Sequence, residues 1–143
     1  MAAMLDALDV ERDNRVLEIG TGSGYNAALL SEYLDSGNVS TIDIDTGLVA
    51  LARDRLAAAG YHPTVAVADG LDGYPANAPY DRIMSTCQTW RLPDAWIRQV
   101  RPGGRIVAVL PSPSWAWTCM RTALPRDVSI RSTSCSWSCA ASA

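Results

Sequence analysis

Glycines and carboxylates near the N-terminus occur in the order that a nucleoside-containing cofactor requires. Residues 18–24 read EIGTGSG, and Asp43 follows about 20 positions later. Glycine has no Cβ, so a ligand can approach the backbone closely at Gly20 and Gly22. A carboxylate at the position of Asp43 can accept hydrogen bonds from ribose hydroxyls. These residues therefore predict a cofactor that carries a ribose.

Two cofactor classes fit this pattern, and the glycine spacing favours one of them. The dinucleotide fingerprint G-x-G-x-x-G would place its last glycine at position 25, which is Tyr25. The spacing here is E-x-G-x-G-x-G. It suits S-adenosylmethionine, which has no phosphate and needs close backbone approach to its methionine portion. Glu18, beside the loop, is then expected to orient the ammonium group. A dinucleotide site and a tight turn without a ligand are the alternatives.

This loop must lie between a strand and a helix, and the flanking sequence predicts both. An apolar run over 15–19 predicts a buried strand, and the helical pattern begins at Gly24. The apolar stripe of this helix is predicted to be Tyr25, Ala28, Leu29 and Tyr33. Residues 39–44 are rich in β-branched side chains and predict a second strand, which places Asp43 near its end.

Later elements continue the alternation of strands and helices. Thr46 is predicted to cap a helix that ends at Gly60. Its predicted apolar face is Leu48, Leu51, Ala52, Leu56 and Ala59. Further strands are expected over 64–68, 80–86 and 105–110, with a helix near Pro93 before the last of them. This alternation predicts a parallel sheet, which binds its ligands at the carboxyl ends of the strands.

Four stretches of the chain resemble one protein family. They read VLEIGTGSGYNAALL, VSTIDID, ADGLDGYPANAPYDRI and LPDAWIRQVRPGGRIV, and they lie between Met4 and Leu110. Together they resemble the class I methyltransferases, and in particular the protein-L-isoaspartate O-methyltransferase family. They are also similar to a branch of that family found beside ribosomal-peptide maturation enzymes. The resemblance implies an α/β, Rossmann-like sheet with helices on both faces, formed by a methyltransferase domain over residues 1–113.

The same resemblance implies roles for individual residues. It implies an S-adenosylmethionine loop at Gly20, Thr21, Gly22 and Gly24, ribose binding by Asp43 and adenine contacts from Ile44, Asp69 and Gly70. Thr86 would end the fourth strand facing the methyl-transfer site and is the predicted catalytic residue. The implied acceptor is an aspartyl or isoaspartyl carboxylate of a protein or peptide. Such a carboxylate is already ionised at pH 7, so the reaction needs neither a general base nor a metal.

Residues after the fourth strand are expected to adjoin the acceptor. Cys87 and Gln88 stand where the family usually has small residues, so they are candidates for selecting the substrate. The simpler expectation for Cys87 is a small buried thiol. Trp90 and Trp96 are candidates for lining the substrate entrance, but burial against the sheet is the favoured prediction for both.

Both ends of the chain depart from the family pattern. The family's stretch before Met4, which helps bind the substrate, is expected to be missing here. Residues 114–143 form an atypical tail that holds three of the four Cys and three of the five Trp, while the whole chain has no Phe. The spacing of these Cys fits no C-x-x-C metal site, and a disulfide scaffold conflicts with the rest of the sequence.

A shifted reading frame is the third interpretation of the tail. Reading each codon from the last base of the one before converts Ser114 onward into VGVDLHEDGSASGRFHPVHLLQLVLRGE, if some third bases and serine codons are chosen freely. This sequence regains Phe, His and a strand-like segment, and it resembles the peptide-maturation branch. We therefore expect the terminal strands of the sheet to be missing or non-native.

Charge and hydropathy narrow the function classes further. The net charge of −3 argues against a nucleic-acid or anionic-membrane partner. No apolar run approaches the roughly 20 residues that span a bilayer, and the first residues have no secretory pattern, so a cytoplasmic location is expected. Three hypotheses follow: a carboxyl methyltransferase, a non-catalytic remnant that keeps the cofactor loop, and a dinucleotide oxidoreductase, which Tyr25 disfavours.

Overall fold

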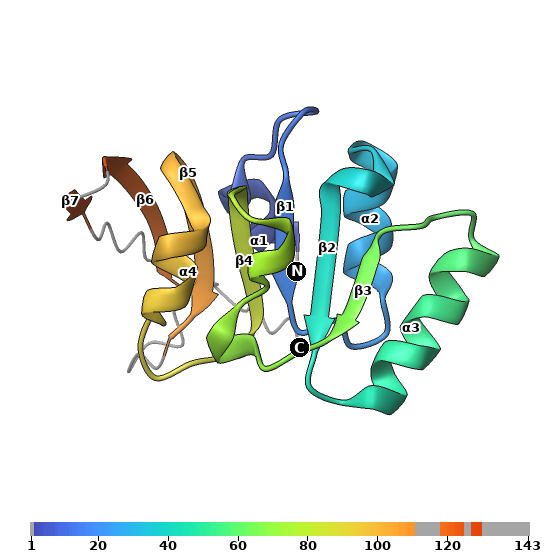
Figure 1. Cartoon of the computed structure of the whole chain (residues 1–143). Helices are drawn as coiled ribbons and strands as arrows, with labels where there is room; N and C mark the ends of the chain where they lie inside the picture. Colours follow the sequence, from blue (N-terminus) through green and yellow to red (C-terminus); the bar gives the residue numbers. More distant parts are fainter. Residues whose placement is uncertain (1, 111–117, 125–126, 130–143) are drawn as a thin grey trace, which may run out of the picture.

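A single sheet organises the computed structural model, which describes residues 2–110, 118–124 and 127–129. Within those residues the strand order is β3-β2-β1-β4-β5-β6-β7 (Figure 1). The strands are β1 (Val16–Ile19), β2 (Val39–Asp43), β3 (Thr64–Val67), β4 (Tyr80–Gln88), β5 (Val100–Val109), β6 (Thr118–Leu124) and β7 (Asp127–Ser129). The five strands from β1 to β5 are parallel, as the alternation of strands and helices predicts.

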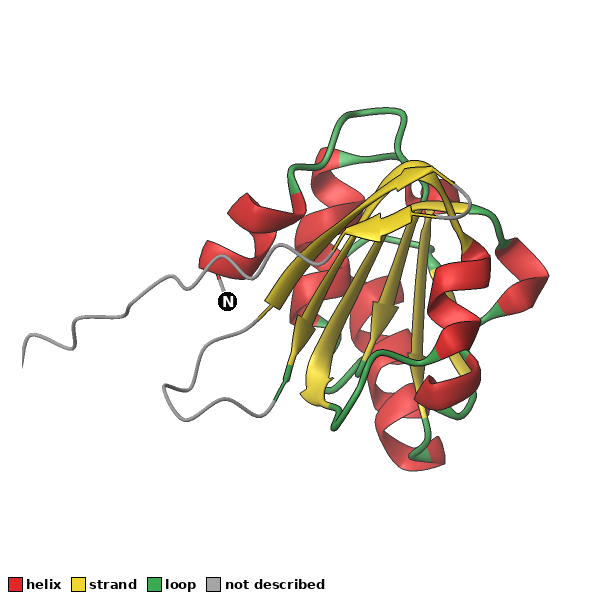
Figure 2. Ribbon diagram, turned by 90° about the vertical axis from the view of Figure 1, so that its left-hand side faces the viewer, coloured by secondary structure: helices red, strands yellow, loops and turns green. Residues whose placement is uncertain are grey.

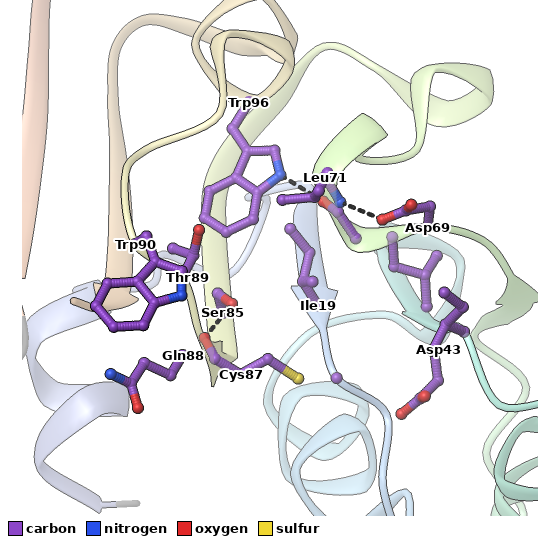
Figure 3. A pocket seen from close by; sticks show the side chains of 14 residues that line it. Ile19, Asp43, Asp69, Leu71, Ser85, Cys87, Gln88, Thr89, Trp90 and Trp96 are labelled. Atoms are coloured by element: carbon purple, nitrogen blue, oxygen red, sulfur yellow. Dashed lines mark hydrogen bonds between the residues drawn. The ribbon is translucent and has the colours of Figure 1, made fainter. Parts of the chain in front are cut away.

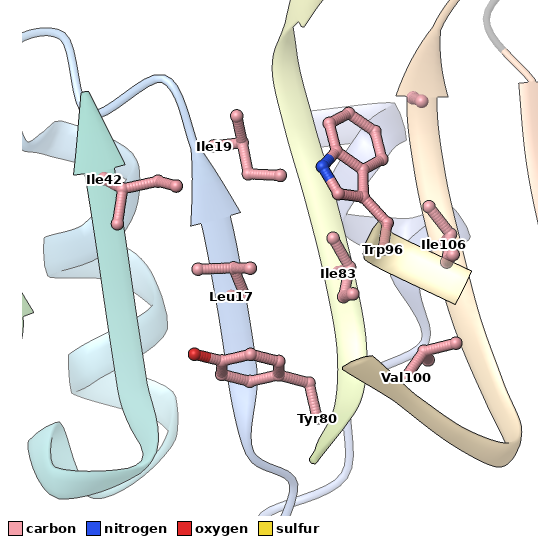
Figure 4. Packing of buried hydrophobic residues seen from close by; sticks show 9 residues of the cluster. Leu17, Ile19, Ile42, Tyr80, Ile83, Trp96, Val100 and Ile106 are labelled. Carbon is pink, nitrogen blue, oxygen red and sulfur yellow. The ribbon is translucent and has the colours of Figure 1, made fainter. Parts of the chain in front are cut away.

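Helices cover both faces of this sheet (Figure 2). They are α1 (Ala2–Leu8), α2 (Tyr25–Tyr33), α3 (Thr46–Ala58) and α4 (Asp94–Gln99), with short 3-10 turns at Ser36–Asn38, Gly70–Asp72 and Pro75–Asn77. Leu8 of α1 and Leu30 of α2 pack with Val16 and Met84 on one face. Trp96 of α4 is buried on the other (Figure 4). The Rossmann-like arrangement predicted from the sequence is confirmed.

The side chains of β1 contribute alternately to the cores on the two faces of the sheet. Leu17 and Ile19 belong to the core cluster that holds Trp96, whereas Val16 belongs to the cluster beneath α1 and α2. Successive side chains of a strand point to opposite faces, so Glu18 lies on the same side as Val16. The strand that leads into the glycine loop is thus buried on both faces, as a central parallel strand is expected to be.

The order of the strands places the glycine loop at the centre of the sheet. β1 pairs with β2 on one side and with β4 on the other, so the chain winds outward from β1 to β3 and then crosses to the other side of β1 to form β4. Parallel strands end at the same edge. The residues that follow β1, β2 and β4 therefore meet there, and this is the position at which such sheets bind ligands.

Two antiparallel strands follow β5, so of the expected alternatives, missing or non-native terminal strands, only the first is excluded. β6 pairs antiparallel with β5, and β7 pairs antiparallel with β6. The hydrogen bonds of a ladder come from the backbone, so a segment of unusual composition can still cover the open edge of β5. The expectation that these residues are non-native stays a prediction. The rest of the atypical tail lies outside the described residues.

The predicted buried stripe of α2 is wrong. Tyr25 is 66% exposed and Tyr33 48%, whereas Asn26, Ala27 and Leu30 are buried. The buried face of α2 lies on the sheet, where Asn26 Nδ2 donates to Glu18 Oε1 and Leu30 packs with Val16. Periodicity detected the helix but assigned its inner face to the larger apolar residues.

The start of α3 also differs from the prediction. Asp45, not Thr46, is the N-cap residue, and its Oδ1 accepts hydrogen bonds from the backbone N–H groups of Gly47 (2.7 Å) and Leu48 (3.0 Å). The helix therefore turns so that Val49 is buried. Ala52 and Leu56 are buried as predicted, but Leu48 and Leu51 are exposed. Gly60 adopts the left-handed conformation typical of a residue just past a helix.

Candidate functional site

A cavity of about 280 Å³ opens at the carboxyl ends of β1, β2 and β4 (Figure 3). Five of the predicted cofactor-binding residues line it: Gly20, Asp43, Ile44, Asp69 and Gly70. The other lining residues are Ile19, Ile42, Leu71, Ser85, Cys87, Gln88, Thr89, Trp90 and Trp96. The structure thus brings together residues that are up to 77 positions apart in the sequence, because the sheet aligns the ends of their strands.

Gly20 occupies a position where no side chain fits. Its φ of +98° lies in the left-handed region. A Cβ there would collide with Thr86 Oγ1 and would lie 2.6 Å from Cys87 Sγ. The backbone N–H groups of Gly20 and Thr21 donate to the carbonyl oxygen of Ile42 at 2.8 and 3.2 Å. The end of β1 is therefore fixed, and the open backbone at Gly20 is part of the cavity wall.

The hydroxyl of Thr86 faces this loop. Its Oγ1 lies 3.0 Å from the carbonyl oxygen of Gly20 and 3.2 Å from that of Ile19, and it can donate to either. Thr86 is not among the cavity-lining residues. Its geometry describes a residue that positions Gly20, and its predicted role in methyl transfer stays a prediction.

Asp43 joins the loop to the end of β2. Its Oδ2 accepts a hydrogen bond from the backbone N–H of Gly22 at 3.2 Å, and its Oδ1 accepts one from the N–H of Asp45 at 3.1 Å. A carboxylate has about four acceptor positions, so both oxygens keep the capacity to accept further hydrogen bonds. Because Asp43 also lines the cavity, the structure leaves a carboxylate available where the sequence predicts ribose binding.

Glu18 lies beneath the loop instead of in the cavity. It is fully buried, and its Oε1 and Oε2 accept hydrogen bonds from Asn26 Nδ2 (2.8 Å) and Thr41 Oγ1 (2.7 Å). The Thr41 hydroxyl is also 2.8 Å from that of Thr21. Burial raises the pKa of Glu18 to about 7, with a smaller contribution from the charge of Asp43, while the bonds from Asn26 and Thr41 lower it.

These contacts make Glu18 a support for the loop, and its predicted contact with an ammonium group stays a prediction. Its carboxyl supports the loop from below through Thr41 and Thr21. Sequence analysis did not identify Thr41 or Asn26 as its partners. The parallel register pairs Glu18 with Thr41, so the alignment of β1 and β2 would have indicated the first of them.

The segment Asp69–Gly70 forms the opposite wall. Asp69 Oδ1 accepts a hydrogen bond from the backbone N–H of Leu71 at 2.9 Å, which starts the 3-10 turn Gly70–Asp72. The indole Nε1 of Trp96 donates to the carbonyl oxygen of Gly70 at 2.7 Å. A Cβ on Gly70 would lie 2.7 Å from Ile19 Cγ2. Glycine is required there because the turn packs directly on β1.

Large apolar side chains are exposed around the cavity. Ile44 is 71% exposed, Leu71 59% and Trp90 87%, and all three line it. Burial against the sheet, predicted for both tryptophans, is confirmed for Trp96 and wrong for Trp90. Apolar surfaces beside the carboxylates of Asp43 and Asp69 fit a flat aromatic base joined to a hydroxylated sugar. This combination matches the adenosine portion of the predicted cofactor.

Cys87 is exposed at the cavity, which corrects the expectation of a small buried thiol. Partial burial of the sulfur raises the pKa of the Cys87 thiol, and the negative charge of Asp43 acts in the same direction. The thiol is therefore held in its neutral form.

Among the residues that the structure describes, no three His, Cys, Asp or Glu side chains are grouped so that they could hold a metal ion. No helix in the described ranges has the length and apolar character to cross a membrane.

Comparison with known proteins identifies a family. The model of the family described as protein-L-isoaspartate(D-aspartate) O-methyltransferase matches residues 1–116. A protein-L-isoaspartate O-methyltransferase of Ignicoccus hospitalis is 45% identical over 109 residues, which cover 75% of this chain and 52% of that protein. One from Azorhizobium caulinodans is 43% identical over 114 residues, covering 79% and 52%. The chain spans about half the length of these curated relatives.

Solved structures agree with the fold. A protein-L-isoaspartate O-methyltransferase structure superimposes with a TM-score of 0.72 at 27% identity, covering 84% of this chain and 39% of that one. A second structure, a Plasmodium falciparum protein described as a methyltransferase of the same kind in complex with S-adenosyl-L-homocysteine, has a TM-score of 0.66 at 11% identity. It covers 93% of this chain and 68% of its own, and at that identity it shows the fold alone.

Proposed function

The chain belongs to the protein-L-isoaspartate(D-aspartate) O-methyltransferase family, and from this premise we propose that it transfers a methyl group from S-adenosylmethionine to a carboxylate of a protein or peptide. The proposed acceptor is an aspartyl or isoaspartyl side chain. The observation that carries the proposal is the cavity at the carboxyl ends of β1, β2 and β4. There the chain's own residues form a glycine-backed wall, an apolar rim and a carboxylate that can accept further bonds.

The residues present fit S-adenosylmethionine. The backbone of Gly20 lines the cavity and would adjoin the methionine portion, and Asp43 offers acceptor oxygens for the ribose hydroxyls. Ile44 and Leu71 provide apolar surface for the adenine, beside the backbone at Asp69. A dinucleotide fits less well, because the spacing of the glycines lacks the third position of that fingerprint. When bound, S-adenosylmethionine supplies a methyl group that a carboxylate oxygen can take directly from the positively charged sulfur.

The protein's contribution to such a reaction is positioning and exclusion of water. An ionised carboxylate is already a nucleophile, so no side chain must remove a proton from it. Thr86 holds the carbonyl oxygen of Gly20, and Trp96 holds that of Gly70, so both walls are fixed before a ligand arrives. A fixed geometry saves the entropy of orienting the two reactants, which is a large part of the barrier for reactions of this type.

Calorimetry tests the cofactor assignment. We expect S-adenosylhomocysteine to bind the purified chain with one site, and NAD not to compete with it. Asp43→Asn should weaken that binding at least about tenfold, because a hydrogen bond to a charged acceptor contributes about 1.5–3 kcal/mol. Binding of NAD but not of S-adenosylhomocysteine would replace the methyltransferase proposal with an oxidoreductase. The acceptor is tested by methyl transfer to an isoaspartyl peptide.

A further inference from the structure

The two ends of the cavity differ in charge. Asp43 and Asp69 carry the charged side chains among the described residues that line it, and both lie at one end. Gln88 and Trp90 lie at the opposite end, with Cys87 between the two groups (Figure 3). An anionic acceptor is repelled by the carboxylates and not by the neutral side chains. An acceptor carboxylate therefore enters most favourably from the end formed by Gln88 and Trp90.

An irregularity in the pairing of β4 and β5 determines which side chains point into this end of the cavity. β4 and β5 pair at Ser85 with Ala108 and next at Gln88 with Val109, so two residues of β4 have no partner on β5. Irregularities of this kind bend a strand and redirect its side chains. Here the extra residues are Thr86, which turns to the glycine loop, and Cys87, which turns into the cavity.

The segment that carries Trp90 is tied at several points. Ser85 Oγ donates to the carbonyl oxygen of Cys87 at 2.9 Å, and the N–H of Thr89 donates to that of Val109 at 3.0 Å. Thr89 Oγ1 donates to the carbonyl oxygen of Arg91 at 2.7 Å. Trp90 lies between Thr89 and Arg91 in the chain, so its backbone is fixed although its side chain is 87% exposed. An indole has only two side-chain torsions, so it loses little conformational entropy when a partner packs on it.

From this arrangement we infer that Trp90 is a specificity-determining residue that packs on the side chain next to the acceptor carboxylate. The inference rests on the proposed function. It assigns the chain a class of substrate: peptides in which an apolar or aromatic residue adjoins the isoaspartyl residue. Gln88, at the same end, offers amide donors and an amide acceptor to the peptide backbone.

Two peptides that differ in one residue test the inference. Both contain the same isoaspartyl residue, followed by Phe in one and by Gly in the other. Binding is measured by calorimetry in the presence of S-adenosylhomocysteine, and methyl transfer is measured as kcat and KM. We expect the wild-type chain to bind the Phe peptide at least about tenfold more tightly, the lower end of what an apolar contact discriminates.

Variants of Trp90 assign that preference to its side chain. Trp90→Ala should remove the preference by weakening binding of the Phe peptide much more than binding of the Gly peptide or of S-adenosylhomocysteine. Trp90→Phe should restore most of it. Tyr33→Ala is the matched control, because Tyr33 is also an exposed aromatic residue but lies on α2, away from the cavity. It should leave the preference intact.

Each result decides between the inference and the proposed function. Equal binding of the two peptides by the wild type, a preference that survives in Trp90→Ala, or no binding of either peptide overturns the inference. Methyl transfer that does not depend on Trp90 supports the proposed function and overturns the inference. Binding that depends on Trp90 but yields no methyl ester sustains the contact between Trp90 and the peptide and refutes the proposed function.

Discussion

The buried carboxyl of Glu18 predicts how stability depends on pH. Its pKa is about 7 in the folded chain against an ordinary value of 4.5. The folded state therefore binds a proton more tightly than the unfolded state does. The associated stability is fully present below pH 4.5 and is lost as the pH rises through about 7. At about 1.4 kcal/mol per pH unit, the loss amounts to about 3 kcal/mol.

Glu18→Gln isolates this effect. Glutamine has the same shape and no charge, and its amide can satisfy Asn26 and Thr41 after the Thr41 hydroxyl turns to accept. Urea unfolding of both proteins at pH 5, 6, 7 and 8 gives the free energies of unfolding. The stability of the variant relative to wild type should rise across this range by most of the 3 kcal/mol, and level off above pH 7.

The matched control for this series is Glu11→Gln, an exposed glutamate that reports on the general effect of removing one negative charge. A difference between Glu18→Gln and wild type that stays constant from pH 5 to pH 8 would refute the reasoning. It would mean that Glu18 is ionised in the folded chain at pH 5, and that the hydrogen bonds from Asn26 and Thr41 outweigh its burial.

Three further substitutions test the walls of the cavity. Gly20→Ala should lower the free energy of unfolding by at least about 1–2 kcal/mol, the cost of a left-handed conformation with a Cβ, and weaken S-adenosylhomocysteine binding; an unaltered protein would contradict the contact with Thr86. Asp43→Asn should reduce that affinity without loss of more than about 1 kcal/mol in urea unfolding; unchanged affinity would remove Asp43 from the site. Trp96→Phe should cost at least about 2 kcal/mol of stability, because it removes the bond to Gly70 and leaves a cavity at a fully buried position; equal stability would show that neither the bond nor the packing of Trp96 contributes.

The elements of this fold that could be predicted from the sequence are those with strong local signals. The parallel strands and the helices between them were predicted because apolar runs, glycines and β-branched segments mark them directly. The orientation of α2 was not, because its inner face consists of Asn26, Ala27 and Leu30, and the larger Tyr25 and Tyr33 dominated the periodic pattern. Which side of a helix is buried depended here on close packing against a neighbour, which the helix's own sequence does not encode.

Some features of the candidate site were likewise predicted from local sequence signals, and others were not. The positions of Gly20 and Asp43 follow from spacing in the chain, and the structure places both at the cavity. Burial of Glu18 and exposure of Trp90 were not predicted. The first depends on the alignment of β1 with β2, and the second on the irregularity between β4 and β5. Both are properties of strand pairing and not of any single segment.

Methyl transfer to a defined peptide tests the central claim most directly. The chain is incubated with S-adenosylmethionine labelled in its methyl group, and with either an isoaspartyl peptide or the same peptide carrying ordinary aspartate. We expect label in a base-labile ester on at least one of these carboxylates, and loss of that label in Asp43→Asn. Binding of S-adenosylhomocysteine with no ester on either peptide would contradict it and leave a cofactor-binding protein without carboxyl methyltransferase activity.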